Sequence, residues 1–244
     1  MRKTLILTGA SRGIGRALAL ELAKAGYDLV LNARREAPLE AVAEEVRALG
    51  ARAEVVAGSA GKAEVARALV EKALELGQFH GFIHNAGVLH PGPLLYELAE
   101  SLFMEVLEAN LIAGYQLARF AYPQLLKRGE GLAVYLGSGA AETNLPGIGA
   151  YAVAKAAEEH LARQLAAEAP EVACFVYRPG VVETDMQRAA REAQGGGAPV
   201  LQRVFRGYRE EGRLLTPEEA ARALVQLLPR ARAFHGRIAT WRDA

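Results

Sequence analysis

Cysteine is nearly absent from this sequence, because Cys174 is the only one among 244 residues. A single cysteine excludes a disulfide within the chain, and the apolar run 172–176 around it favours a buried, inert thiol. The sequence also lacks any hydrophobic run near the roughly 20 residues that cross a bilayer. The run after Arg2 and Lys3 is only a few residues long and leads directly into Thr8, so we expect a strand there and not a secretion signal. We therefore expect a cytoplasmic protein with no membrane partner.

An excess of charge of one sign is lacking as well. Lys and Arg number 29 against 28 Asp and Glu, a net charge of +1. This balance gives no electrostatic footprint for nucleic acid, and clusters such as Arg34 and Arg35 are too sparse to form a basic block. His80 and His84 lie four residues apart on an expected strand, where that interval spans roughly 13 Å. They cannot share a metal ion, and we predict no metal site.

Short aliphatic runs alternate with longer helical patterns, and no linker, repeat or change of composition divides the chain. The alternation predicts a single α/β domain over residues 1–244, a doubly wound Rossmann fold whose seven-stranded parallel sheet is flanked by helices on both faces. Strands are expected at 4–8, 28–33, 53–57, 80–84, 132–137, 172–178 and 236–241, and helices at 14–25, 39–49, 62–76, 97–127 with room for an interruption, 150–168 and 217–227.

The segment from Gln187 to Arg213 departs from this alternation. It is rich in Gly and Arg and contains the triplet 195–197 and Pro199. Long loops in compact domains are usually lids or disordered tails. Because this segment is internal and follows a strand end, we interpret residues 185–213 as a lid over a site.

Three glycines follow the first expected strand. Gly9, Gly13 and Gly15 lie between that strand and a helical pattern. Such a turn lets the backbone pass close to a pyrophosphate, while the helix N-terminus offers free N–H groups. The spacing Gly-x-x-x-Gly-x-Gly differs from the commonest dinucleotide fingerprint, so the turn alone leaves a plain glycine turn open.

Tyr151 and Lys155 lie four residues apart in an Ala-rich stretch of high helix propensity, so their side chains share one helix face. A tyrosine with its usual pKa of about 10 is rarely ionised at neutral pH, and a fixed cation beside it favours the phenolate. The pair can therefore give or take a proton near neutrality. Taken alone, such a pair is more often a solvated surface feature.

Several motifs accompany this pair in register. Through these motifs taken together, the chain resembles the short-chain dehydrogenase/reductase family, in its single-domain Tyr-x-x-x-Lys branch, across nearly its whole length. The resemblance implies an oxidoreductase that moves a hydride between a nicotinamide dinucleotide and a carbonyl/alcohol pair. The motifs that carry it are the glycine turn, Asn85-Ala86-Gly87 after the fourth strand, Asn110, Ser138 thirteen positions before Tyr151, the Tyr151/Lys155 pair, and Pro179-Gly180 leading to Thr184.

The resemblance implies four catalytic residues. Ser138 would hydrogen-bond the reacting oxygen, and Tyr151 would give that oxygen a proton or remove it. Lys155 would lower the pKa of the phenol and bind the nicotinamide ribose. Asn110 would mark a helix distortion that holds a water in line with Lys155. The plainer alternatives are a turn-forming serine and an exposed polar asparagine.

A cofactor site is implied around the glycine turn and around the turns after the fourth and sixth strands. Its expected residues are Gly9, Ser11, Arg12, Gly13, Ile14, Gly15, Arg34, Asn85, Ala86, Gly87, Tyr151, Lys155, Pro179, Gly180, Val182 and Thr184.

The end of the second strand predicts which cofactor is used. NAD enzymes of this architecture place a carboxylate there for the ribose 2′-hydroxyl, whereas an arginine accommodates the 2′-phosphate of NADP. Here Ala33 takes the place of the carboxylate, Arg34 follows it, and Arg12 comes from the other side. We therefore predict that NADP(H) is preferred over NAD(H).

Three positions depart from the family pattern. His84 stands where a second asparagine is usual, which we expect to alter packing without touching the chemistry. The acid that commonly follows the third strand is missing from residues 57–60, so contact with the adenine is expected to be weaker. The C-terminus, residues 236–244, lacks the glycine-rich ending of tetrameric members. In the family, helices equivalent to 97–127 and 150–168 pair across a two-fold axis, which implies a homodimer or homotetramer.

Two other functions stay open. A 3-oxoacyl-carrier-protein reductase is favoured by residues 183–186 and by the chain length, but the C-terminus and the lack of a basic patch for an acidic carrier protein count against it. A regulatory protein that senses dinucleotide without turnover would tend to lose the tyrosine or the lysine, and both are present. Residues 88–96, 139–149 and 185–213 are expected to line the substrate pocket, and their composition indicates an apolar or mixed small molecule.

Overall fold

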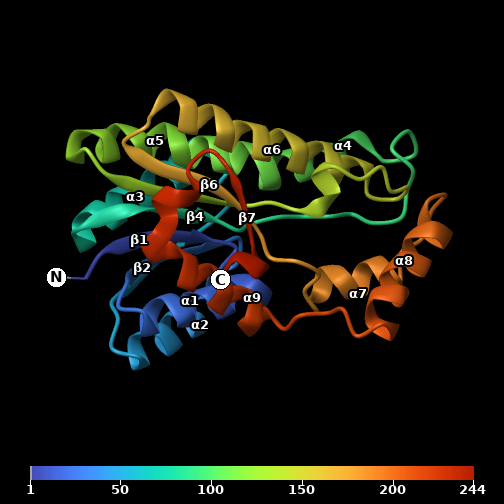
Figure 1. Ribbon diagram of the computed structural model, residues 1–244, viewed down its shortest axis with the longest axis horizontal. Helices are drawn as coiled ribbons and strands as arrows, with labels where there is room; N and C mark the ends of the chain where they lie inside the picture. Colours follow the sequence, from blue (N-terminus) through green and yellow to red (C-terminus); the bar gives the residue numbers. More distant parts are fainter. Residues whose placement is uncertain (1) are drawn as a thin grey trace.

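A computed structural model describes residues 2–244, and a parallel sheet forms its centre (Figure 1). In this part of the chain seven strands lie in the order β3-β2-β1-β4-β5-β6-β7, and each neighbouring pair is parallel. The order changes direction between β1 and β4, the kind of switch point at which doubly wound sheets bind ligands. The strands are β1 (Thr4–Thr8), β2 (Asp28–Ala33), β3 (Ala53–Ala57), β4 (Phe79–His84), β5 (Gly131–Leu136), β6 (Val172–Arg178) and β7 (Ile238–Thr240).

Helices cover both faces of the sheet. Figure 1 shows one layer that includes α4, α5 and α6 and, across the sheet, a second that includes α1, α2 and α9. The first layer consists of α3 (Ala63–Leu76), α4 (Glu100–Leu107), α5 (Ala113–Arg128) and α6 (Gly149–Glu168), and the second of α1 (Gly13–Lys24), α2 (Glu36–Ala48) and α9 (Pro217–Leu227).

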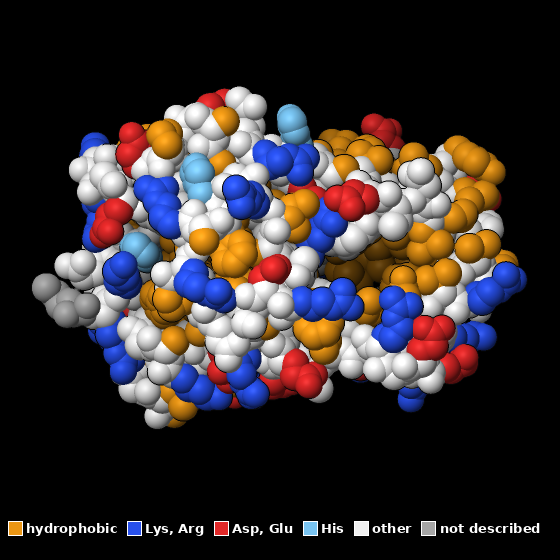
Figure 2. All heavy atoms as spheres, in the orientation of Figure 1, with side chains coloured by type: hydrophobic (Ala, Val, Ile, Leu, Met, Phe, Trp, Pro, Cys, Tyr) orange, Lys and Arg blue, Asp and Glu red, His pale blue; other side chains and the backbone are white. Residues whose placement is uncertain are grey.

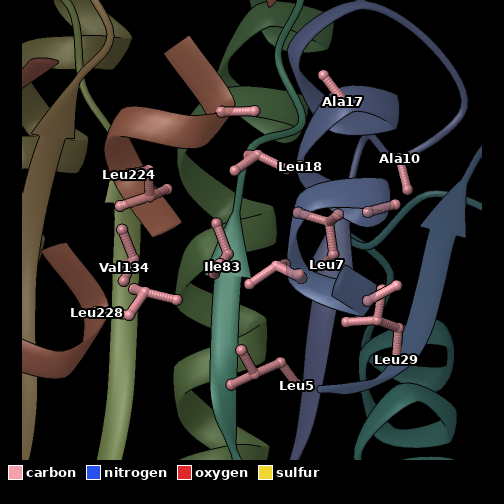
Figure 3. Close-up of a cluster of buried hydrophobic side chains, with 14 of the residues drawn as sticks. Leu5, Leu7, Ala10, Ala17, Leu18, Leu29, Ile83, Val134, Leu224 and Leu228 are labelled. Carbon is pink, nitrogen blue, oxygen red and sulfur yellow. The ribbon is translucent and has the colours of Figure 1, made fainter. Parts of the chain in front are cut away.

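Each face of the sheet has its own hydrophobic core, because successive strand side chains point to opposite sides. Leu5 and Leu7 of β1 pack with Leu18 of α1 and Leu224 of α9 (Figure 3). Ile6, between the two leucines, belongs to the opposite core, which α3, α5 and α6 cover. Fully burying one such side chain contributes about 1.5–3 kcal/mol. The two cores fix the sheet, and with it the loops at the carboxyl ends of its strands.

The doubly wound fold is confirmed, and each of the seven expected strands is present within residues 2–244. The long helix expected at 97–127 is interrupted. After α4 ends at Leu107 the chain makes one wider turn, the π-helix η1 (Glu108–Ile112), and then continues as α5.

The prediction of a loop from Gln187 to Arg213 is wrong, because most of this segment forms two helices. These are α7 (Asp185–Arg191) and α8 (Ala198–Glu210). Thr184 caps α7, since its hydroxyl oxygen accepts the N–H of Gln187 at 3.4 Å. Pro199 lies in the first turn of α8, where a missing N–H costs nothing. The glycines and the proline that read as loop signals therefore mark the boundary between two helices.

Candidate active site

A glycine turn closes the carboxyl edge of the sheet beside the switch point. Gly9 and Gly13 have φ of +65° and +54°, a region that favours glycine. A Cβ on Gly15 would collide with the carbonyl oxygen of Gly9, so the turn folds tightly against the start of α1. Asn85 ties β4 to the same turn, because its Nδ2 donates to the oxygens of Thr8 at 3.0 Å and Gly9 at 3.1 Å. The N-terminus of α1 therefore faces the space over the turn, which suits a phosphate.

A cavity of about 460 Å³ runs from this turn to α6. Figure 2 shows the surface hollowed beside the α7–α8 end of the molecule, with hydrophobic side chains gathered in the hollow. Gly180 and Val182, two expected cofactor residues, do not line the cavity: a Cβ on Gly180 would meet Trp241, and Val182 is buried and bridges to Leu215. The other expected positions that line it are Gly9, Ser11, Arg12, Gly13, Ile14, Gly15, Arg34, Asn85, Ala86, Gly87, Tyr151, Lys155, Pro179 and Thr184.

Tyr151 and Lys155 stand one turn apart on α6, and both line the cavity. The Nζ of Lys155 lies 5.7 Å from the centre of the Tyr151 ring. It donates to the carbonyl of Leu136 and to the carboxylate of Glu158, each at 2.7 Å. Burial alone would lower the pKa of Lys155, but Glu158 and Tyr151 outweigh burial and raise this pKa. A cation therefore stands permanently beside the phenol, which favours its exchange of a proton.

Ser138 follows β5 at the same edge of the sheet. Its backbone N–H donates to Glu159 at 3.1 Å, and its hydroxyl oxygen accepts the N–H of Ala140 at 3.2 Å. The hydroxyl hydrogen stays available for another acceptor. Glu159 is itself held by two hydrogen bonds from Arg178, at 2.9 and 2.7 Å. Ser138 does not line the cavity, although Gly137 before it does.

Asn110 lies in η1 and is fully buried, which excludes the plainer interpretation of an exposed polar residue. Its Nδ2 donates to the carbonyls of Val88 at 2.9 Å and Val106 at 2.8 Å. Its Oδ1 has no hydrogen-bond partner among residues 2–244. A Cβ on Gly87 would lie 2.6 Å from that oxygen. The π-helical turn thus brings Asn110 against the loop after β4 and holds the loop in place.

Two residues of the site were not predicted from the sequence. Glu158 is fully buried and binds Lys155, its neighbour three positions earlier on α6. His84 was expected to affect packing only, yet its Nε2 lies 3.6 Å from the Glu158 carboxylate. The available signal for Glu158 was its spacing from Lys155, because residues three apart on a helix share a face. Nothing in the sequence alone indicated that His84 would meet that face.

Arginines surround the far end of the cavity. Arg12, Arg34 and Arg35 all line it. Arg34 Nη1 donates to Glu105 at 2.6 Å, and Arg12 Nη1 donates to Asp185 at 3.0 Å. The two arginine side chains are 64% and 68% exposed, so these ion pairs are weak and can be exchanged for other anions.

The turn after β3 borders the same end of the cavity. Gly58, Ser59 and Ala60 line it. The Ser59 hydroxyl donates to Glu108 at 2.6 Å, and Glu108 opens the π-helical turn. The turn therefore borders the cavity with small residues, and the Ser59 hydroxyl ties the turn to the π-helical turn.

Residues 2–244 lack two kinds of feature. Within this range no helix has the length and apolar character needed to span a bilayer. The same residues contain no group of three or more His, Cys, Asp or Glu side chains placed to hold a metal ion.

Several known proteins are similar to this chain in sequence and in structure. Residues 3–195 match the family model described as short chain dehydrogenase. An uncharacterised oxidoreductase of Saccharomyces cerevisiae is 32% identical, over 97% of this chain and 91% of that protein. A 3-oxoacyl-[acyl-carrier-protein] reductase of Staphylococcus aureus is 30% identical, over 78% of each chain. The X-ray structure of an alcohol dehydrogenase from the archaeon Thermococcus sibiricus, complexed with 5-hydroxy-NADP, superposes with a TM-score of 0.82 at 30% identity, covering 98% of this chain and 96% of the other.

Proposed function

Because this chain belongs to the short-chain dehydrogenase family, we propose that it transfers a hydride between NADP(H) and a carbonyl/alcohol substrate, with Tyr151 as the general acid and base. One observation carries the proposal: Tyr151 and Lys155 line the cavity that begins at the glycine turn. The cavity therefore joins a phosphate-binding turn to a proton donor.

The residues at the turn fit a dinucleotide. The close approach of Gly15 to Gly9 leaves backbone where a side chain would block a pyrophosphate. When bound, the nicotinamide supplies or accepts the hydride. We keep the cofactor residues expected from the sequence as the proposed binding set. Gly180 and Val182 do not line the cavity. We propose that these two residues act by shaping the backbone of the segment that contains Pro179 and Thr184.

We assign the proton chemistry to this chain's own side chains. Tyr151 gives a proton to the carbonyl oxygen during reduction and takes it back during oxidation. Lys155 stabilises the phenolate, and the free hydroxyl hydrogen of Ser138 donates to the same substrate oxygen. Asn110 keeps the adjacent loop and the helix distortion in place, with its unpaired Oδ1 available to a proton relay.

An apolar substrate end is supported by the side chains beside Tyr151. Leu89, Ile148 and Leu201 form a buried cluster, against which Tyr151 and Met186 pack. Met186 also lines the cavity. Such a wall favours an aliphatic or aromatic carbonyl compound over a strongly charged one.

A substrate screen tests the function. The protein is mixed with NADPH and a set of ketones, aldehydes and a 3-oxoacyl thioester, and nicotinamide absorbance is followed. We expect carbonyl-dependent oxidation of NADPH. A marked preference for the thioester would favour the acyl-carrier-protein reductase, which is supported by the S. aureus relative. NADPH binding with no turnover on any carbonyl would instead favour a dinucleotide-sensing protein.

We also propose a symmetric dimer or tetramer built on α4, α5 and α6. Met104, Tyr115 and Val153 on these helices are 54%, 46% and 46% exposed, which leaves apolar area to be covered. We expect light scattering at micromolar concentration to give two or four times the mass of one chain. Tyr115→Arg should lower that mass, whereas Leu74→Arg, an exposed apolar position on α3, should not. A monomeric wild-type protein would contradict the proposal.

We propose that the helices α7 and α8 form the lid over the cavity. Arg12 of the glycine turn bonds Asp185 at the start of α7, and Met186 reaches the cavity. We expect NADPH to slow amide hydrogen exchange in residues 185–210, because cofactor under these helices reduces their opening. Exchange in α9, which does not line the cavity, is the internal control. Unchanged exchange in residues 185–210 at saturating NADPH would exclude the lid.

A further inference from the structure

A buried charged cluster lies directly behind the Tyr151/Lys155 pair. Glu158 and His84 are 0% exposed and Lys155 is 4% exposed. Glu158 Oε2 accepts from Lys155 Nζ at 2.7 Å. Glu158 Oε1 has no hydrogen-bond partner among the described residues, and His84 Nε2 lies 3.6 Å from it. The carboxylate therefore sits between the lysine of the site and a histidine of β4.

The hydrogen bonds of Thr8 fix the tautomer of His84. The Thr8 hydroxyl oxygen accepts the N–H groups of Asn85 and Ala86, each at 3.1 Å. Both of its lone pairs are then used, so its own hydrogen goes to His84 Nδ1, 2.9 Å away. We assign the ring proton to Nε2, which faces the Asn110 carbonyl at 3.3 Å and the Glu158 carboxylate. The N–H of His84 thus bonds the Asn110 carbonyl and also faces Glu158 Oε1, the carboxylate oxygen that Lys155 does not bind.

His84 carries no charge in this cluster. Burial, helped by nearby Lys155, lowers the pKa of His84 to about 3. Burial raises the pKa of Glu158 to about 7, against the opposing effect of Lys155. The other groups facing the cluster are Tyr135 of β5, whose pKa burial raises well above its usual value, and Glu159 of α6, which is paired with Arg178 of β6. Above its pKa, Glu158 is the one negative charge in contact with Lys155 among residues 2–244.

We propose that Glu158 is a positioning residue for Lys155 and that its carboxylate keeps the Tyr151/Lys155 pair protonated over the neutral range. The proposal rests on the proton-transfer role proposed for Tyr151. The charge on Glu158 offsets part of the field of the ammonium, and its Oε2 holds Nζ against the Leu136 carbonyl.

The sign of the effect does not depend on which of the two groups gives up the proton. Tyr151 and Lys155 are coupled, so the first proton leaves the pair as a unit. A negative charge nearby makes that loss harder, and its removal makes the loss easier. Without the Glu158 charge, the pair should therefore release its proton at a lower pH.

Glu158→Gln tests this, because it keeps the size and the acceptor oxygen and removes the charge. In plots of log kcat/KM against pH, we expect the rising limb for alcohol oxidation to shift to lower pH by about one unit. The falling limb for carbonyl reduction should shift by the same amount in the same direction. Glu158→Asp keeps the charge and should restore the limbs to their wild-type positions. Glu168→Gln removes an exposed charge from the same helix and should leave both limbs in place. If the limbs of Glu158→Gln stay in place or shift to higher pH, the proposal is overturned.

A second measurement separates this proposal from the proposed function. The near-ultraviolet absorbance of phenolate, with the signal of Tyr151→Phe subtracted, follows Tyr151 without turnover. We expect its midpoint to fall in Glu158→Gln even if no substrate is found, and an unchanged midpoint would overturn the role of Glu158 alone. If Glu158→Gln does not fold, His84→Phe keeps a ring and removes the donor that faces Oε1. It should shift the midpoint in the same direction by a smaller amount, and a shift to higher pH would overturn the proposal.

Discussion

Tyr151→Phe is expected to lower kcat for carbonyl reduction by about 10²–10⁴-fold, the scale of a lost general acid. The substitution removes one hydroxyl from a side chain in the cavity wall and leaves its ring against the apolar cluster that contains Leu89, Ile148 and Leu201. The Kd for NADPH should therefore change little. Steady-state kinetics together with a cofactor-binding titration measure the two quantities separately.

A matched control measures the effect of removing a phenol hydroxyl outside the cavity. Tyr27 precedes β2, at the opposite end of the sheet from the cavity. Tyr27→Phe should keep wild-type kcat. If Tyr151→Phe retained most of its turnover on a good substrate, Tyr151 would not be the proton donor.

The second large effect concerns cofactor choice. One charge-assisted bond to the 2′-phosphate is worth roughly 1.5–3 kcal/mol, so NADPH should be preferred over NADH by about ten- to a hundredfold in kcat/KM. Arg34 is available for this bond, because its side chain is largely exposed and Glu105 is its one ion-pair partner within residues 2–244. Ala33→Asp combined with Arg34→Ala should reverse the preference, since a carboxylate repels the phosphate and accepts the ribose hydroxyl.

The control for this variant is Arg16→Ala. Arg16 belongs to α1 and pairs with Glu45, and it does not line the cavity. Its loss should leave the preference for NADPH unchanged. Equal kcat/KM for NADH and NADPH in the wild-type protein would contradict the assignment.

The sequence predicted the sheet well because its strands are short runs bounded by strong signals. Buried parallel strands are apolar on both faces, as in Leu5-Ile6-Leu7, and such runs are hard to mistake when glycine follows. Tyr151 and Lys155 could be placed on one face because a spacing of four residues on a helix fixes it, and the motifs in register with them marked the pair as functional.

Other features depend on contacts that no local pattern contains. The helices α7 and α8 were missed because Gly195 and Pro199 are loop signals in isolation, whereas here they lie between helices and in a first turn. Glu158 looked like an ordinary polar helix residue. Glu158 is buried against His84 of β4, and this tertiary contact joins residues that lie far apart in the sequence.

Transfer of deuterium from the cofactor to the product tests whether the protein moves a hydride between NADPH and a carbonyl. NADPH carrying deuterium at both C4 positions of the nicotinamide is incubated with the protein and an apolar ketone found in the screen, and the alcohol is analysed by mass spectrometry. We expect the alcohol to gain one deuterium at the carbinol carbon, at a rate that Tyr151→Phe lowers by about 10²–10⁴-fold. Tight NADPH binding with no deuterium in any alcohol product would contradict hydride transfer by this protein.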